Sequence, residues 1–304
     1  MCVDNPELER PKSLEEINEQ ISEFANSFNR VILLIDRFID NPLEEALDRL
    51  DPPAKIRTIK DPIFESATHR APLLVELDYS VPSHLELSQH SLGIGMERAM
   101  GGGAPRICAW LFTHSRLNEI HDEIRQRLNV RYPNGEQLYF RYFDPRVMYQ
   151  LQRILNHARD TKDTSNFFDI LGSVNVWCYI SLGGRLKAHL NENACLSHFR
   201  GILRFNENVA AAIDRIGMLN RSIVEVVRNS GKYVSEGDTE IDSKIVEAGK
   251  YKITKNDDRI SYAKWASINP NKFYSYPQID ILISKTLNEG MPLEAVFSLE
   301  FKLG

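Results

Sequence analysis

The chain has 304 residues, of which 42% are hydrophobic, and a formal net charge of −5. This length allows one large domain or, as we expect, two, and the composition supports a sizeable core. The acidic balance argues against a general nucleic-acid binder, because phosphate contacts need a basic face. The sequence has no apolar run of about 18 residues, so it predicts no membrane span.

The beginning of the sequence and its cysteines together predict a cytoplasmic protein. The first residues, MCVDNPE, are acidic and lack the apolar stretch of a secretory signal. The four cysteines are far apart and form no Cys-x-x-Cys pair, so we expect reduced thiols rather than a disulfide framework or a metal site. They are Cys2, Cys108, Cys178 and Cys195.

The first two thirds of the chain alternate between predicted helices and strands. Ser13 and Glu16 have the spacing of a capping box at the start of a helix that runs to Phe28. The continuous apolar run 31–36 indicates a buried strand, and Asn41-Pro42 then starts a second helix. Further strands are expected at 55–59, 72–77, 107–112 and 138–143, and further helices at 83–100, 115–128 and 145–155.

Two glycine-containing pairs mark expected hairpin turns, and the pattern changes after them. Asn134-Gly135 precedes the strand 138–143, and Gly183-Gly184 separates strands at 174–182 and 185–190. After about residue 195 the strand signals almost vanish, and Asn206 begins a helical pattern. We therefore predict an α/β fold: an N-terminal mixed-sheet α/β domain, residues 1–192 with a helical extension at 1–28, and an α-helical C-terminal domain, residues 193–304.

The segment from Leu138 to Val147 is the most informative part of the chain. Its sequence, LYFRYFDPRV, places aromatic residues around one arginine and ends in Asp-Pro-Arg. Such a segment predicts a buried central strand, in which Arg141 and Asp144 need partners because an unpaired buried charge is costly. We assign Arg141 to an internal ion pair and Asp144-Pro145 to the cap of the next helix. Arg146 is then the better candidate for an exposed contact.

No other motif predicts a cofactor, a metal site or a catalytic site with comparable force. Glycines 93, 95 and 101–103 lie in or after a predicted helix, which is the wrong place for a phosphate loop. His114 and His121 are seven residues apart, whereas paired metal ligands on a helix prefer a separation of four. Asp36 and Asp40 follow the first strand, where carboxylates bind metals in some enzymes. They are the best enzymatic hint, although a role in the loop and the helix cap is favoured.

Arginine is used unevenly along the chain. Between Asp61 and Thr161 there is no lysine, whereas arginine occurs eleven times. Arginine suits bidentate carboxylate pairing and is enriched at protein interfaces, so a protein-binding surface and a set of internal ion pairs are both open explanations. The aromatic segment from Trp265 to Tyr276 also has two possible interpretations. It is either an anchor for a partner or a set of side chains that pack between helices.

Several of these elements together resemble a known family. The combination comprises the helix ending near Val130, the Asn134-Gly135 turn and the run FRYFDPRV from Phe140. An early LLID strand with a PLEEAL helix and the strand APLLVEL from Ala71 are also similar. The chain resembles the adaptor or chaperone family of the bacterial type VI secretion system, which is often described only as a domain of unknown function and is encoded beside the VgrG spike.

The resemblance implies a protein without turnover. It would bind a secreted toxic effector in the cytoplasm and help load it onto VgrG, with no cofactor, nucleic acid or membrane involved. Recognition would use β-augmentation along a strand edge or a groove between the two domains. The alternatives are a metal-dependent hydrolase or nuclease that uses Asp36 and Asp40, and an immunity protein that binds a toxin. The candidate partner-binding residues are Arg146, Arg131, Arg127, Trp265 and Tyr274.

Overall fold

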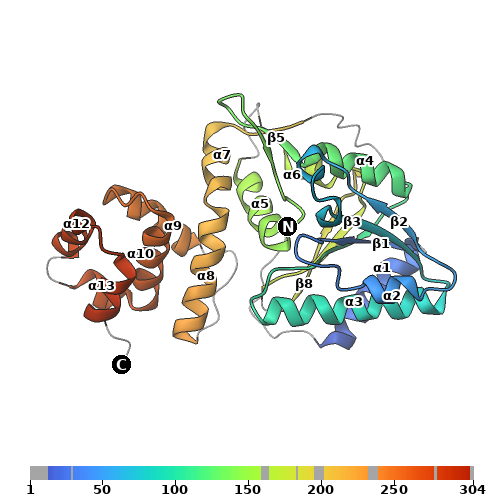
Figure 1. Ribbon diagram of the computed structural model, residues 1–304, viewed down its shortest axis with the longest axis horizontal. Coiled ribbons are helices and arrows are strands. Elements are labelled where there is room, and N and C mark those ends of the chain that lie inside the picture. Colours follow the sequence, from blue (N-terminus) through green and yellow to red (C-terminus); the bar gives the residue numbers. More distant parts are fainter. Residues whose placement is uncertain are drawn as a thin grey trace. The chain divides into compact units, whose positions relative to one another are not determined.

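The N-terminal part of the chain combines sheets with helices and the C-terminal part is helical, which confirms the predicted α/β class (Figure 1). The computed structural model describes residues 13–28, 30–158, 164–182, 184–194, 202–231, 239–276 and 279–301. Cys2, Cys195, Gly183 and residues 160–163 of the expected linker lie outside this range. The chain divides into two compact units, Met1–Ala210 and Ala211–Gly304.

The main sheet of the first unit has six strands in the order β2-β3-β1-β4-β7-β8, and every neighbouring pair is antiparallel. A smaller sheet has the order β6-β5-β9 and is mixed, because β5 and β9 are parallel. The strands are β1 (Arg30–Ile35), β2 (Lys55–Thr58), β3 (Leu73–Asp78), β4 (Ile107–Phe112), β5 (Asn129–Arg131), β6 (Gln137–Tyr139), β7 (Val176–Ile180), β8 (Leu186–Leu190) and β9 (Leu203–Arg204).

Helices in this unit include α1 and α3, which contact each other and the main sheet (Figure 1). The helices are α1 (Leu14–Phe28), α2 (Glu44–Asp48), α3 (Pro82–Met100), α4 (Leu117–Arg127), α5 (Pro145–His157) and α6 (Phe167–Leu171), with short 3-10 turns at Pro62–Phe64 and Thr68–Arg70. No helix among the described residues is both long enough and apolar enough to cross a membrane.

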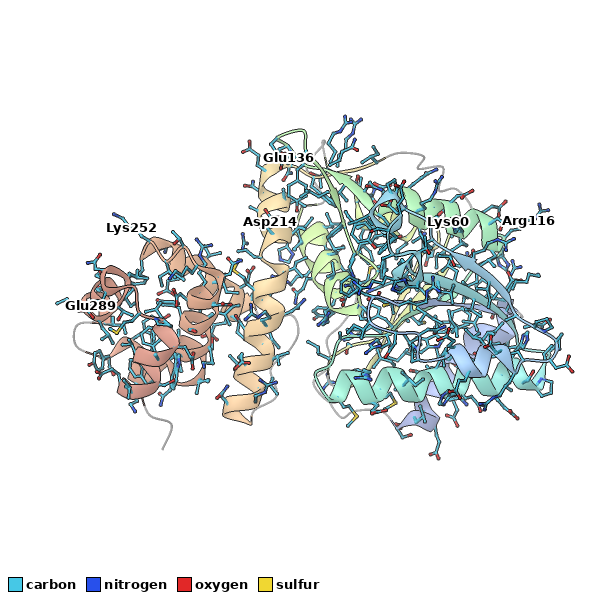
Figure 2. The ribbon with its side chains drawn as sticks, in the orientation of Figure 1. Lys60, Arg116, Glu136, Asp214, Lys252 and Glu289 are labelled. Atoms are coloured by element: carbon cyan, nitrogen blue, oxygen red, sulfur yellow. The ribbon has the colours of Figure 1, made fainter. Side chains whose placement is uncertain are left out.

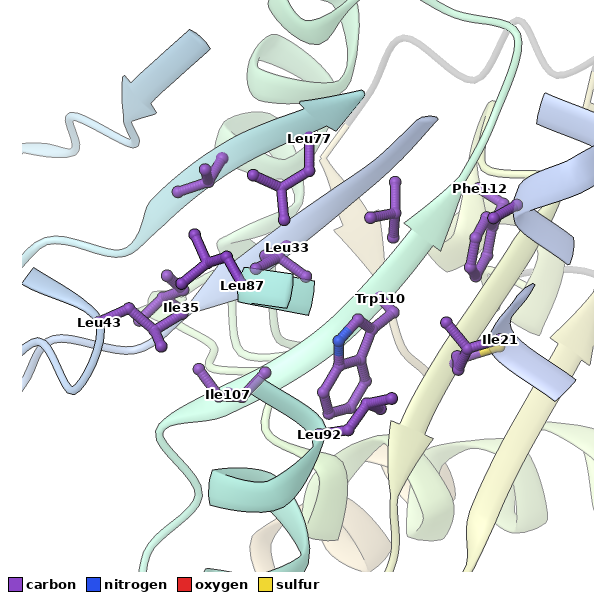
Figure 3. Close-up of a cluster of buried hydrophobic side chains, with 14 of the residues drawn as sticks. Ile21, Leu33, Ile35, Leu43, Leu77, Leu87, Leu92, Ile107, Trp110 and Phe112 are labelled. Atoms are coloured by element: carbon purple, nitrogen blue, oxygen red, sulfur yellow. The ribbon is translucent and has the colours of Figure 1, made fainter. Parts of the chain in front are cut away.

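The core lies between α1, α3 and one face of the sheet (Figure 3). Leu33 of β1 stands opposite Trp110 of β4, and both are fully buried. The Trp110 indole Nε1 donates a 2.9 Å hydrogen bond to Ser91 Oγ on α3, which satisfies its polar atom inside the core. All six residues of β4 are buried, because both faces of this strand are covered. This burial explains why the apolar run is continuous rather than alternating.

The prediction of a strand at 138–143 is wrong. Only Gln137–Tyr139 forms a strand, β6, and it lies at the edge of the small sheet with Leu138 exposed. After Phe140 the chain turns, and the Asp144 N–H donates to the Arg141 carbonyl at 3.1 Å. Tyr142 and Phe143 are still fully buried, and Tyr142 packs against Trp177 of β7 with ring centres 5.9 Å apart. The aromatic residues are therefore core residues in a turn, which gives the same composition as a buried strand.

The predicted hairpins are confirmed. The Asn134-Gly135 turn joins β5 to β6, and Gly135 has a positive φ of 85° that favours glycine. The second hairpin pairs β7 with β8. The predicted domain boundary at residues 192 and 193 precedes β9, whose pairing with β5 joins Leu203 and Arg204 to the first unit.

The second unit consists of helices packed around α10 (Asn256–Ile268), which contacts α8, α9, α11 and α13. The aromatic segment from Trp265 to Tyr276 is mostly helical, because Trp265 belongs to α10 and Pro270 begins α11. The remaining helices are α7 (Glu207–Asp214), which contains the division between the units, α8 (Ile216–Ser230), α9 (Thr239–Lys250), α11 (Pro270–Tyr274), α12 (Ile279–Glu289) and α13 (Leu293–Glu300).

Two glycines on α3 provide a test of the packing in the core. A Cβ atom at Gly95 would lie 2.9 Å from the Trp110 ring, whereas one at Gly93 would meet nothing within 4 Å. We expect Gly95→Ala to lower the free energy of unfolding by about 1–3 kcal/mol through overpacking. Gly93→Ala should raise it by about 0.5–1 kcal/mol, because alanine favours the helix. Urea denaturation measures both changes, and equal effects of the two substitutions would contradict the placement of Trp110.

A buried histidine on β8 makes stability depend on pH. Burial lowers the pKa of His189 from 6.5 to about 4, and Lys187 adds to this effect. The folded state therefore favours the neutral ring, so the stability contribution is complete above pH 6.5 and is lost as the pH falls towards 4. Between pH 7.5 and 5 we expect a loss of about 2 kcal/mol.

The matched variant for this pH effect is His189→Gln, which has no titratable ring. Its free energy of unfolding should fall less than that of the wild type over the same pH interval. Identical pH dependence in the two proteins would show that His189 does not titrate in this way.

Candidate functional site

The site begins where β1 ends, at Asp36. The Asp36 N–H donates a 2.8 Å bond to the Arg106 carbonyl, which holds the chain against the residue that precedes β4. Its side chain is only 8% exposed. Its Oδ1 accepts a 3.0 Å bond from the Phe38 N–H, and its Oδ2 pairs with Arg141 Nη2. The turn after the strand thus fixes a buried carboxylate opposite a single guanidinium group.

Asp144 extends this pair into a chain of alternating charges. Arg141 Nη2 lies 3.8 Å from Asp144 Oδ2, so Arg141 bridges two carboxylates. Asp144 caps α5 by accepting a 3.0 Å bond from the Arg146 N–H, as the Asp-Pro pair predicts. The Arg146 guanidinium binds the same carboxylate through Nε at 3.0 Å and Nη2 at 2.7 Å. We call Asp36, Arg141, Asp144 and Arg146 the acid–arginine network.

The electrostatics of the network follow from its burial. Burial raises the pKa of Asp36, and the nearby Arg141 guanidinium opposes that rise. The hydrogen bonds to Asp144 raise the pKa of Arg146. Burial also raises the pKa of the neighbouring Cys108 thiol, so this cysteine is a packed, protonated side chain. The network thus holds its charges in pairs, and the adjoining thiol is not a nucleophile.

The two aspartates that the sequence suggested as metal ligands both face arginines. Asp36 pairs with Arg141, and Asp40 pairs with the buried Arg106. Positive charge already lies against each carboxylate, which opposes the binding of a further cation there. Within the described ranges no group of three or more His, Cys, Asp or Glu side chains is placed to hold a metal ion.

Two large apolar residues are exposed directly beside the network. Phe38 is 51% exposed and Ile39 is 65% exposed. The guanidinium carbon of Arg70 lies 5.5 Å from the centre of the Phe38 ring, and that of Arg141 lies 5.9 Å from it. We call Phe38, Ile39 and Arg70 the Phe38 surface. Exposed aromatic and arginine side chains on a fixed support are typical of protein-binding sites.

One of the two edge strands of the main sheet, β2, has its outer backbone groups occupied by side chains of the protein itself, whereas the other edge strand is β8. The Ile59 N–H bonds to the Pro72 carbonyl on the β3 side, so Ile56 and Thr58 direct their backbone groups to the edge. The Ile56 carbonyl accepts a 3.0 Å bond from Arg57 Nη1, and the Thr58 carbonyl accepts a 3.1 Å bond from His121 Nε2. A peptide adding to β2 would have to displace both side chains, so this edge is poorly suited to β-augmentation.

The predicted partner-binding residues have different surroundings in the two units. Arg131 is exposed on β5, and Arg146 is engaged by Asp144. Arg127 is 2% exposed and donates to the Asp169 carbonyl and to Glu123, which makes it an internal residue. In the second unit, Trp265 is 5% exposed and its Nε1 donates to Glu294, so it packs in the helical core. Tyr274 is partly exposed, and its hydroxyl donates to Glu247.

Sequence reasoning did not identify the Phe38 surface. The sequence feature that could have indicated this surface is the position of Phe38 and Ile39. These two large apolar residues follow a buried strand and lie beyond its apolar run. It also left the partner of Arg141 open, because Asp36 is 105 residues away and only the fold brings the two together.

Comparison with known families gives a match over the part of the chain that contains these residues. Residues 32–161 match the DUF4123 family, a domain of unknown function. The DUF4123 segment covers less than half of the chain, and it contains the whole acid–arginine network and the Phe38 surface. No curated protein and no solved structure gives a significant match to the chain.

The network predicts a specific stability effect for Arg141→Ala. Removal of the guanidinium leaves Asp36 buried without its counter-charge, which costs about 3 kcal/mol in a fully buried pair. Because a third of the Arg141 side chain is exposed, we expect a loss of roughly 2 kcal/mol in the free energy of unfolding. Arg131→Ala, at an exposed position, should change it by less than about 0.5 kcal/mol.

A second substitution tests whether the unpaired carboxylate causes that loss. Asp36→Asn in the Arg141→Ala background should recover part of the stability, because the amide is neutral. If Arg141→Ala leaves denaturant unfolding unchanged, Arg141 does not hold the network together.

Proposed function

We propose that this protein is a cytoplasmic adaptor that binds a toxic effector of a type VI secretion system and helps load it onto the VgrG spike. The observation that carries the proposal is the coincidence of the DUF4123 segment with the FRYFDPRV motif. This motif is the strongest part of the resemblance to the adaptor family. In the structure it supplies three of the four residues of the acid–arginine network.

The physical character of the region supports a binding role. The network holds the turn after β1 in place through the buried Asp36 side chain. The exposed side chains of Phe38 and Ile39 belong to that turn. A support that is already ordered lowers the entropy cost of binding, because few side chains remain to be immobilised. Arginine stacked on an aromatic ring is also a frequent component of binding hot spots. We therefore place effector binding at the Phe38 surface.

The test is co-purification from the native host. The tagged wild-type chain should recover a secreted effector, VgrG or both. The double variant Phe38→Ser, Ile39→Ser should recover at least about tenfold less, because two hot-spot side chains of about 1–2 kcal/mol each are lost.

The matched control removes two equally exposed apolar side chains from the second unit. Ile281→Ser with Leu299→Ser makes the same chemical change at positions that are 61% and 71% exposed. This control should retain the partner. If the wild type recovers neither an effector nor VgrG, the adaptor function is wrong. Rescue of cells from a toxin without any effect on secretion would instead identify an immunity protein.

A further inference from the structure

A groove beside the small sheet differs in character from the Phe38 surface. Its walls come from the segment after β2, the end of α4 and the strands β5 and β6, and its volume is about 660 Å³. The residues that matter for its chemistry are Lys60, Ile63, Arg125, Asn129, Gln137 and Tyr139. We call it the Lys60 groove, and Lys60 is labelled on the surface of the first unit in Figure 2. The volume is within the range of ligand and peptide sites.

The groove carries uncompensated positive charge. Among the described lining residues the one carboxylate belongs to Asp61, against the two cations of Lys60 and Arg125, so the balance is positive. Asp61 is buried and accepts a 3.1 Å bond from the Ile63 N–H and a 2.9 Å bond from Asn129 Nδ2, so its oxygens face the protein. Lys60 and Arg125 are both exposed, and neither forms an ion pair with any residue that the structure describes. In the acid–arginine network, by contrast, each arginine has a carboxylate.

Apolar and amide groups line the groove together with these cations. Ile63 is 54% exposed at the groove. Gln137 and Tyr139 are two residues apart on β6 and therefore share one face of that strand. The Tyr139 ring is held edge-on against Phe64 with centres 5.5 Å apart, so it is a fixed wall rather than a mobile side chain. A ligand that fills the groove thus needs apolar side chains as well as negative charge.

The strand β6 adds a further feature for an extended ligand. It is the outer strand of the small sheet and pairs with β5 on one side only within the described part of the chain. Its Gln137 and Tyr139 line the groove together with Asn129, which stands opposite Tyr139 on β5, so the groove lies over one face of the small sheet and reaches the outer strand β6. Backbone groups at such an edge bind extended peptides independently of their sequence, and side-chain pockets select among them.

We propose that the Lys60 groove binds an extended acidic segment of the delivered protein, in which carboxylate side chains alternate with aliphatic ones. The carboxylates would pair with Lys60 and Arg125, and the aliphatic side chains would cover Ile63 and Tyr139. Charge complementarity identifies this occupant, because the groove presents two exposed cations that form no ion pair with a described residue, whereas its described carboxylate, Asp61, is buried. The inference rests on the proposed adaptor function and names the chemistry of the segment that is recognised.

The first experiment uses two fluorescein-labelled octapeptides, one alternating glutamate with leucine and one alternating lysine with leucine. Fluorescence anisotropy with the full chain should show binding of the acidic peptide at least about tenfold tighter than binding of the basic one. This affinity should fall as salt is added, because exposed charges are screened. Equal binding of the two peptides overturns the proposal.

The second experiment reverses the charge of the groove. Lys60→Glu with Arg125→Glu should abolish the preference for the acidic peptide without changing the melting temperature, because neither side chain has an internal partner. The control, Arg98→Glu with Lys250→Glu, makes the same change in net charge at exposed positions elsewhere and should bind as the wild type does. Retention of acidic-peptide binding by the groove variant overturns the proposal.

Two outcomes separate this inference from the proposed function. If the wild type and the groove variant recover an effector equally well from the host, the adaptor function stands and the groove is not its contact. If the wild type recovers no partner but binds the acidic peptide selectively, the groove stands and the adaptor function fails. Self-association that disappears in the groove variant would show that the occupant is a second copy of this chain, which also overturns the proposal.

Discussion

The pairing of Asp36 with Arg141 is the interaction on which the architecture of the DUF4123 segment depends. It joins the end of the first strand of the sheet to a turn that lies 105 residues later in the chain. Asp144 and Arg146 continue the same chain of charges into the first turn of α5. Both carboxylates are buried, and Asp36 has Arg141 as its ion-pair partner, so removing Arg141 leaves Asp36 with the cost of an unpaired buried charge.

This arrangement also accounts for the unusual use of arginine. A guanidinium group can bind two carboxylates at once through its planar set of donors, and Arg141 does so with Asp36 and Asp144. Arg106 and Arg127 make further internal pairs with Asp40 and Glu123. Four of the eleven arginines in this stretch, Arg106, Arg127, Arg141 and Arg146, thus form ion pairs within the chain. Arg70 and Arg125 differ from these internal arginines, since each is exposed and has no ion pair among the described residues.

The surface features of the first unit fit a protein that holds another polypeptide. An ordered network supports an exposed aromatic and aliphatic pair, side chains of the protein occupy the β2 edge of the main sheet, and an open groove lies beside the small sheet. The blocked edge directs recognition away from β2 and towards side-chain surfaces. The adaptor function that we propose needs such selectivity, because an open sheet edge binds extended chains with little discrimination.

The sequence by itself determined the local elements and the class of the fold. The apolar run of β4, the Asn134-Gly135 turn and the Asp144-Pro145 cap are each set by neighbouring residues, and the structure contains all three. Only the tertiary structure decided that the aromatic residues after Phe140 are buried in a turn rather than a strand, since burial selects the same residues in both. It also decided that Asp36 is the partner of Arg141 and that Arg127 and Trp265 are internal. Pairings across such distances depend on how the strands are ordered in the sheet, and no local pattern of residues encodes that order.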